Sequence, residues 1–122
     1  TVQATWNLLE RSAGPALDEA HDAGMGVIVK EALANGRLAG SDDRADAAHL
    51  GGWPPDAVAL AAAASQPWAD VVLSGAATVD QLRSNLQACQ VMSDLDPDSV
   101  LAAVAPIESE RYWSERSQRP WT

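Results

Sequence analysis

A turn in the second half of the chain combines a glycine with polar residues that could bind an anion. Gly75 follows a short apolar run, and Thr78 stands three residues before Gln81. This spacing is that of a capping box, in which the Thr hydroxyl accepts from the Gln main-chain N–H and the Gln side chain reaches back. The first N–H groups of a helix have no helical partner and favour negative charge. The sequence therefore predicts either a phosphate-binding turn or an ordinary strand-to-helix connection that binds nothing.

A strand and a helix are predicted on either side of this turn. Residues 71–73 are apolar and mostly β-branched, which is typical of a strand buried on both faces of a parallel sheet. Apolar residues then recur at helical spacing, so a helix should begin at about Thr78 and run to about Gln90. A break in the helix is expected over residues 91–94.

The segment 75–86 resembles strand eight and helix eight of the aldo-keto reductases, where the pattern is close to G-A-S-x-x-x-Q-L-x-x-N-L. The matching residues are Gly75, Gln81, Leu82, Asn85 and Leu86. In that family the segment holds the adenosine 2′-phosphate and the adenine of NADP(H). The resemblance therefore implies that four residues contact this cofactor: Gly75, Thr78, Gln81 and Asn85. Ala77 stands where the family usually has Ser, Thr or Arg, so Thr78 or Arg83 would have to supply the missing side-chain donor.

The beginning of the chain resembles strand six of the same family, which has the pattern V-Q-x-x-Y-N-L-L-x-R. Val2 and Gln3 match its first two positions, and residues 6–11 match most of the others. The family's Gln hydrogen-bonds the nicotinamide carboxamide, and the resemblance implies this role for Gln3. Without the resemblance, Gln3 is an ordinary polar residue of a strand.

Residues 30–38 resemble the end of strand seven, where an aromatic residue precedes S-P-L-A-x-G-x-L and the segment cradles the cofactor pyrophosphate. Leu33, Ala34, Gly36 and Leu38 match this pattern. Cofactor contacts are implied for Leu33, Gly36 and Leu38, and for Lys30 before them. Lys30 replaces the aromatic residue that stacks on the nicotinamide, and Glu31 replaces the serine. Either the cofactor lies differently, or Lys30 and Glu31 pair and the main chain alone holds the phosphate. An ion pair at the end of a strand, with no ligand, is an equal alternative.

Strands and helices alternate along the chain, which predicts an α/β fold. Strands are expected at residues 1–6, 26–30 and 71–73, with a helix after each. Connections of this kind force parallel pairing and a right-handed crossover. The resemblance implies that residues 1–122 are the C-terminal part of a (β/α)8 TIM barrel, with about three parallel strands and flanking helices. In such barrels the binding loops lie at the carboxyl ends of the strands.

Proline and glycine residues mark the remaining helix boundaries. A first helix is expected at Pro15, with Ser12 as a possible cap, and Gly24 should end it. Another helix should begin near Pro55, and a later one at Pro97 after an Asp cap. The tail after this last helix is expected to be either a further helix packed on the body or a mobile end.

Three other residues could do chemistry but are expected to be structural. His21 is expected at a helix surface, His49 in a loop, and Cys89, the only cysteine, in the core. No metal site is predicted. The catalytic Asp, Tyr, Lys and His of the resembled family belong to the first half of its barrel, and no residue here matches their motifs. We therefore expect no catalytic residue, and we expect these residues alone to bind at best part of a cofactor.

Composition limits the class of partner. The chain has 122 residues and a net charge of −9, which argues against nucleic acid or an anionic membrane. No apolar run is long enough to span a bilayer, and a single cysteine without an internal disulfide fits a cytoplasmic protein.

Three hypotheses about function remain. The first is the cofactor-binding part of an NADP(H)-dependent oxidoreductase that acts on small carbonyl or alcohol substrates. The second is a reductase-like regulatory or assembly module without catalysis, and the third is an inactive fragment. An open three-stranded sheet would also need a partner, which is the missing half-barrel, a second copy or another polypeptide.

Overall fold

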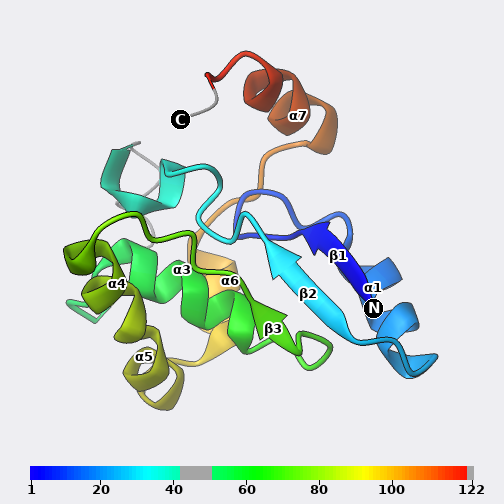
Figure 1. Ribbon diagram of the computed structural model, residues 1–122, viewed down its shortest axis with the longest axis horizontal. Helices are drawn as coiled ribbons and strands as arrows, with labels where there is room; N and C mark the ends of the chain where they lie inside the picture. The colour runs from blue at the N-terminus through cyan, green and yellow to red at the C-terminus, as the bar shows by residue number, and fades with distance from the viewer. Residues whose placement is uncertain (42–50, 121–122) are drawn as a thin grey trace.

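Three parallel strands form a sheet in the order β1-β2-β3 (Figure 1). The structure is a computed structural model, and it describes residues 1–41 and 51–120. The strands are Val2–Thr5 for β1, Val27–Lys30 for β2 and Val71–Val72 for β3. The prediction of an α/β fold with three parallel strands and flanking helices is therefore confirmed.

Helices connect the strands and continue beyond them. Their bounds are Gly14–Asp22 for α1, Pro55–Ala64 for α3, Val79–Leu86 for α4, Ala88–Asp94 for α5, Pro97–Ala103 for α6 and Ser109–Ser117 for α7. A short π-type turn, η1, covers Arg37–Ser41 and bends at Gly40. Among the described residues, no helix has both the length and the apolar character needed to cross a bilayer.

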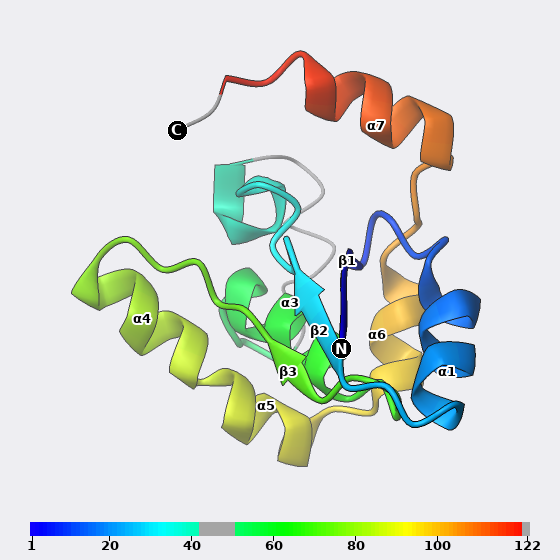
Figure 2. The same ribbon diagram turned by 45° about the vertical axis from the view of Figure 1, so that its right-hand side comes forward.

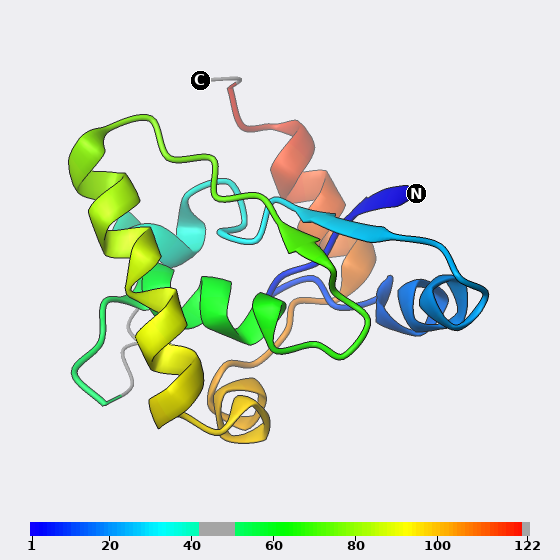
Figure 3. The same ribbon diagram turned by 60° about the horizontal axis from the view of Figure 1, so that its bottom comes forward.

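One face of the sheet packs against the helices. Val27 and Val29 lie in a core whose other buried members are Trp6, Leu17, Ala32, Leu60, Ala63 and Trp68. The rings of Trp6 and Trp68 meet edge to face, with 5.7 Å between their centroids. Helix α3 lies directly behind the strands (Figure 2), and α4 and α5 follow one another beside it (Figure 3).

The opposite face of the sheet is largely open. Gln3, Ile28 and Val71 form one row across the three strands on this face. Val71 is 48% exposed and Leu73 is 44% exposed. The prediction that residues 71–73 form a strand buried on both faces is therefore wrong. The reason is that β3 is an edge strand, and the core of the described residues lies on the other face.

A second core joins α3 to the C-terminal helices. Tyr112 of α7 is completely buried in it. Its other members include Leu8, Leu9, Ala34, Leu38, Val58, Val91, Val100 and Val104. Of the two alternatives for the tail, the structure therefore shows a last helix packed on the body.

The region after α4 differs from the prediction. Instead of one helix to Gln90 and a break over residues 91–94, the chain turns at Gln87 and α5 then continues to Asp94. Val91 is buried against α3, and this contact stabilises helix where the sequence suggested a break. Cys89 is exposed, so its predicted place in the core is wrong, because Val91 rather than Cys89 faces α3.

The first helix has Pro15 in its first turn and ends where predicted, but it lacks the predicted cap. Gly24 adopts a φ of +86° just after the last turn of α1, as expected for a residue that ends a helix. Ser12 does not cap α1, because its hydroxyl donates to the carboxylate of Glu10 instead. His21 is partly exposed, and His49 lies outside the described residues.

Candidate functional site

A pocket of about 500 Å³ lies beyond the ends of β2 and β3. Its walls come mainly from residues 30–39 and residues 73–85, with Asp56 between them. Six of the residues that the family resemblance implies line this pocket: Lys30, Leu33, Gly36, Gly75, Gln81 and Asn85. Two of the three resembling segments are therefore brought together, as expected for the carboxyl ends of neighbouring parallel strands.

Three other implied residues do not line this pocket. Gln3 is exposed on β1, in the row with Ile28 and Val71. Leu38 is completely buried in the second core. Thr78 lies between lining residues, but its hydroxyl is used to cap α4. The segment that contains Gln3 therefore does not contribute to the pocket.

The predicted capping box is present at the start of α4. Thr78 Oγ1 accepts from the Gln81 main-chain N–H at 3.1 Å, and Gln81 Oε1 accepts from the Thr78 N–H at 3.2 Å. Gln81 Oε1 also accepts from the Ala77 N–H at 2.8 Å, and Ser74 Oγ accepts from the Ala76 N–H. Side chains of the same turn therefore already occupy several of the main-chain donors that were expected to bind an anion.

Asp56 and Asn85 fasten α4 to the start of α3. Ser84 Oγ donates to one carboxylate oxygen of Asp56 at 2.8 Å. With its amide oriented to satisfy both neighbours, Asn85 donates to the other carboxylate oxygen at 2.8 Å and accepts from Ser74 Oγ at 3.1 Å. Asn85 is only 6% exposed. Its amide therefore holds the pocket wall in place, which is a structural role beside the cofactor role that the resemblance implies.

The loop after β2 has an unusual backbone. Glu31, Ala34 and Asn35 all have positive φ angles, between 51° and 56°, and Gly36 follows at +87°. Non-glycine residues in this region are strained, and such strain persists only where surrounding contacts hold it. Here the main-chain N–H groups of Ala34 and Gly36 donate to carbonyls inside the loop, and Asn7 Nδ2 donates to the Glu31 carbonyl at 3.0 Å. The loop is therefore rigidly shaped, but these amides do not point at a ligand.

Lys30 and Glu31, the two departures from the family pattern, do not pair with each other. The carboxylate of Glu31 accepts from Arg116 of α7, with distances of 3.3 and 3.4 Å. The alternative in which Lys30 neutralises Glu31 is therefore wrong. Lys30 stays exposed at the pocket wall, where the other charged lining residues are Glu31 and Asp56. The lining side chains thus include one ammonium group and two carboxylates, of which Glu31 is paired with Arg116, so they do not make the pocket strongly electropositive.

Tyr112 is the residue whose role the sequence did not reveal. Its hydroxyl accepts from Asn7 Nδ2 at 3.1 Å, and the guanidinium of Arg37 lies 5.1 Å from its ring centroid. Burial raises the pKa of Tyr112, and the charge of Glu31 adds to this, while the hydrogen bond from Asn7 and the charges of Arg37 and Arg116 oppose it. The only signal in the sequence was that a single tyrosine stands in a charged tail.

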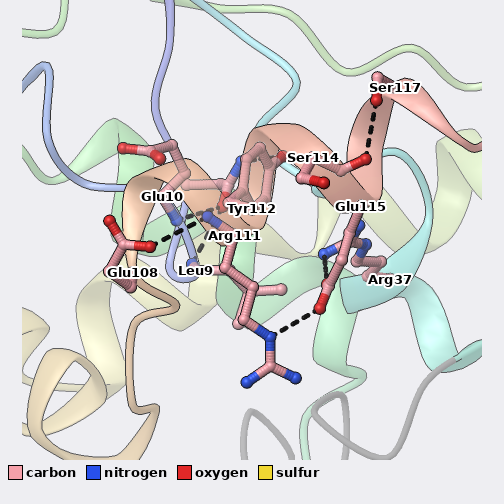
Figure 4. A network of polar contacts seen from close by, with 10 residues as sticks. Leu9, Glu10, Arg37, Glu108, Arg111, Tyr112, Ser114, Glu115 and Ser117 are labelled. Carbon is pink, nitrogen blue, oxygen red and sulfur yellow. Dashed lines mark hydrogen bonds and ion pairs between the residues drawn. The ribbon is translucent and has the colours of Figure 1, made fainter.

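A network of ion pairs and hydrogen bonds holds α7 in place (Figure 4). Glu115 accepts from the buried Arg37 at 3.1 Å and from Arg111 at 2.8 Å. Glu108 caps the helix by accepting from the main-chain N–H of Arg111 at 3.0 Å. Through Arg37 and Tyr112, the tail is therefore fixed to the same loop that lines the pocket.

Comparisons with known proteins add no assignment. Within residues 1–41 and 51–120, no group of three or more His, Cys, Asp and Glu side chains could hold a metal ion. No protein-family model matches this chain, and no curated protein matches it.

Proposed function

We propose that this chain is the cofactor-binding part of an aldo-keto reductase-like oxidoreductase that uses NADP(H) and acts on small carbonyl or alcohol substrates. In this proposal β1, β2 and β3 are three consecutive strands of a (β/α)8 barrel. The observation that carries the proposal is the pocket at the ends of β2 and β3. Two segments that resemble the cofactor-binding segments of the family, residues 30–38 and 75–86, meet there.

The pocket suits part of a dinucleotide. Its volume of about 500 Å³ lies in the range of small-molecule sites. Gly75, with a φ of +67°, turns the chain into the first turn of α4, where the helix dipole favours a phosphate. Lys30 adds an ammonium group. A bound NADP(H) would supply hydride transfer, and the role of these residues is to hold and orient it.

The proposal gives no catalytic role to residues of this chain. Tyr112 is completely buried, and its hydroxyl accepts a hydrogen bond from Asn7, so it does not reach a substrate in the pocket. Proton transfer to the carbonyl oxygen is therefore assigned to residues in another part of the working enzyme.

Ala77 offers the sharpest test, because it stands at the position where the family usually has a donor to the 2′-phosphate. Ala77→Arg should place a guanidinium at the pocket wall. We expect NADPH to bind about tenfold more tightly, as for one charge-assisted contact, and NADH to bind unchanged. Ala103→Arg, on an exposed position of α6, adds the same charge elsewhere and should change neither affinity. Calorimetric titration measures all of these affinities.

Two results would count against the proposal. An equal gain in NADPH affinity for Ala77→Arg and Ala103→Arg would indicate a general effect of charge. It would exclude a 2′-phosphate site at residue 77. A chain that binds neither NADPH nor NADH, with or without the new arginine, would remove the cofactor site altogether.

A second candidate function is a reductase-like regulatory or assembly module without catalysis. The charges of the pocket favour it, because Asp56 opposes the phosphates of a dinucleotide, and Arg116 already pairs with Glu31 rather than with a phosphate. The discriminating measurement is NADPH oxidation by the complete protein with a simple aromatic aldehyde. Turnover would exclude the module, whereas NADPH binding without turnover would favour it over the oxidoreductase.

The oxidoreductase proposal also requires a partner for the open side of the molecule. Large apolar side chains are exposed from β3 through α4, namely Val71, Leu73, Val79, Leu82 and Leu86. Exposed apolar side chains that lie together mark interaction surfaces. We propose that further βα units of the barrel cover this side, since the net charge of −9 opposes pairing with a second copy. Sedimentation velocity tests this: a monomer agrees with the proposal, and a dimer that Leu82→Asp dissociates would show self-association instead.

A further inference from the structure

A second pocket, of about 260 Å³, lies between α7 and the ends of β1 and β2. It is lined by Thr5, Lys30, Glu31, Trp113, Arg116 and Ser117. Lys30 and Glu31 belong to both pockets, so the two sites share one wall.

The balance of charge differs between the two pockets. The second pocket has two cationic side chains, Lys30 and Arg116, and one carboxylate, Glu31. Arg116 already neutralises Glu31 through contacts of 3.3 and 3.4 Å. Lys30 is the only lysine of the chain, and it forms no ion pair with any described residue. Among the residues that the structure describes, the charge of Lys30 in the second pocket therefore has no carboxylate partner.

The remaining walls supply a hydrogen-bond donor and an apolar surface. Thr5 is only 6% exposed, and its hydroxyl makes no hydrogen bond to another described residue. Ser117 Oγ donates to the Ser114 carbonyl at 2.7 Å, so its proton is not available to a ligand. Trp113 is 43% exposed, and its indole ring is supported edge to face by Tyr112. The residues around this small cavity therefore include an ammonium side chain, a hydroxyl that no described residue uses and a partly exposed aromatic ring.

We propose that this second pocket binds a small monocarboxylate with a flat apolar body. The ammonium of Lys30 and the hydroxyl of Thr5 donate to the carboxylate, and charge-assisted hydrogen bonds of this kind are the strong ones. The apolar body lies against the indole of Trp113. Lys30 also lines the first pocket, but Thr5 and Trp113 do not, so this site can be tested separately from the dinucleotide site.

Benzoate is the probe, and benzyl alcohol is its neutral counterpart. In ¹⁵N-resolved NMR titrations without any nucleotide, benzoate should shift the Trp113 indole resonance saturably. Benzyl alcohol should bind about tenfold more weakly, because it lacks the charge. Equal affinity for both compounds would overturn the proposal, as would saturable binding that leaves Trp113 unchanged.

Two charge variants locate the contact. Lys30→Gln should weaken benzoate binding about tenfold or more, which is the usual loss for a charged hydrogen bond. Arg83→Gln removes the same charge from the exposed surface of α4 and should leave the affinity within about twofold, because exposed charges are screened. If both variants lose affinity equally, the effect comes from net charge and the site is excluded. Both positions are exposed, so neither variant should disturb folding.

A chemical label gives an independent readout. Because Lys30 is the only lysine, reductive ¹³C-methylation places one side-chain probe in the pocket and keeps its positive charge. This resonance should move on addition of benzoate and should need about tenfold more benzyl alcohol for a saturable shift. A methyl resonance of Lys30 that does not respond to saturating benzoate would overturn the proposal.

Discussion

Helices α3 and α4 come directly before and after β3 in the sequence, but their apolar side chains are buried in one and exposed in the other. Every side chain from Ala57 to Ala63 in α3 is buried, whereas α4 exposes 64% of Val79 and 61% of Leu86. Helix α3 packs against the sheet, α5 and α6, so its apolar residues are buried on every side of the helix. The apolar residues of α4 recur at the spacing of an amphipathic helix, yet the row that they form is exposed to solvent. The comparison teaches that apolar spacing predicts a helix, while the surrounding elements decide which side is covered.

The same substitution in the two helices tests this contrast most strongly. Leu60→Ala in α3 should lower the free energy of unfolding by about 3 kcal/mol, because it leaves a cavity against Trp68. Leu82→Ala in α4 should change it by about 0.5 kcal/mol or less, because Leu82 is 46% exposed. Urea denaturation measures both values. A large loss for Leu82→Ala would mean that a partner covers α4 in solution.

Helix α7 differs from both, because ion pairs to Arg37 and Glu31 hold it in addition to the buried ring of Tyr112. Glu115→Gln should lower the free energy of unfolding by about 2 kcal/mol, since it leaves the buried Arg37 without its carboxylate. Glu110→Gln, at an exposed position of the same helix, is the control and should be nearly neutral. Thermal or urea unfolding gives the difference. Equal stability of the two variants would show that α7 is held by Tyr112 alone.

The cap of α4 should matter more to this helix than to the molecule as a whole. Thr78→Ala removes the hydroxyl that accepts from Gln81, and we expect a loss of about 1 kcal/mol. Because α4 buries little apolar surface, amide hydrogen exchange should speed up in α4 and stay slow in α3. Thr78→Ser keeps the hydroxyl and should behave like the original protein. Equal acceleration of amide exchange in both helices would contradict the prediction that α4 opens independently of α3.

Alkaline pH should affect the second core through Tyr112. Burial raises the pKa of its hydroxyl above the ordinary value of 10.0. The unfolded chain then loses this proton first as the pH rises. The stabilising contribution of Tyr112 is therefore complete below about pH 10 and is lost as the pH approaches the folded pKa. The free energy of unfolding should fall more steeply above about pH 10 than in Tyr112→Phe, which cannot ionise.

The single tyrosine makes this prediction easy to check. Ultraviolet absorbance of tyrosinate reports Tyr112 alone in the folded chain. Ionisation at the ordinary pKa of a tyrosine, without unfolding, would show that α7 does not stay docked in solution.

The features that the sequence predicted correctly depend on near neighbours. The capping box needs only Thr78 and Gln81, and the helix starts at Pro55 and Pro97 follow from the restricted backbone of proline. The proximity of residues 30–38 and residues 75–86 could also be predicted, because parallel strands place their carboxyl ends at one edge of a sheet.

The features that were missed depend on contacts between distant residues. Asn7 donates to Tyr112, 105 positions later, and Arg37 reaches Glu115 across 78 positions. No local pattern marks such pairs, since each residue alone suits a surface or a turn. The exposure of Cys89 was missed for a similar reason, because it depends on which side of α5 meets α3.

The contacts of Asn7 affect the order in which parts of the chain can fold. Its Oδ1 accepts from the main-chain N–H groups of Leu9 and Glu10, and its Nδ2 donates to the Glu31 carbonyl and the Tyr112 hydroxyl. Because Asn7 is completely buried, its amide lacks one partner until α7 has docked. The segment that follows β1 therefore reaches its final surroundings only after residue 112 has been synthesised and α7 has docked. Completion of this core is therefore expected to be a late step of folding, because contacts between residues so far apart in the sequence form slowly.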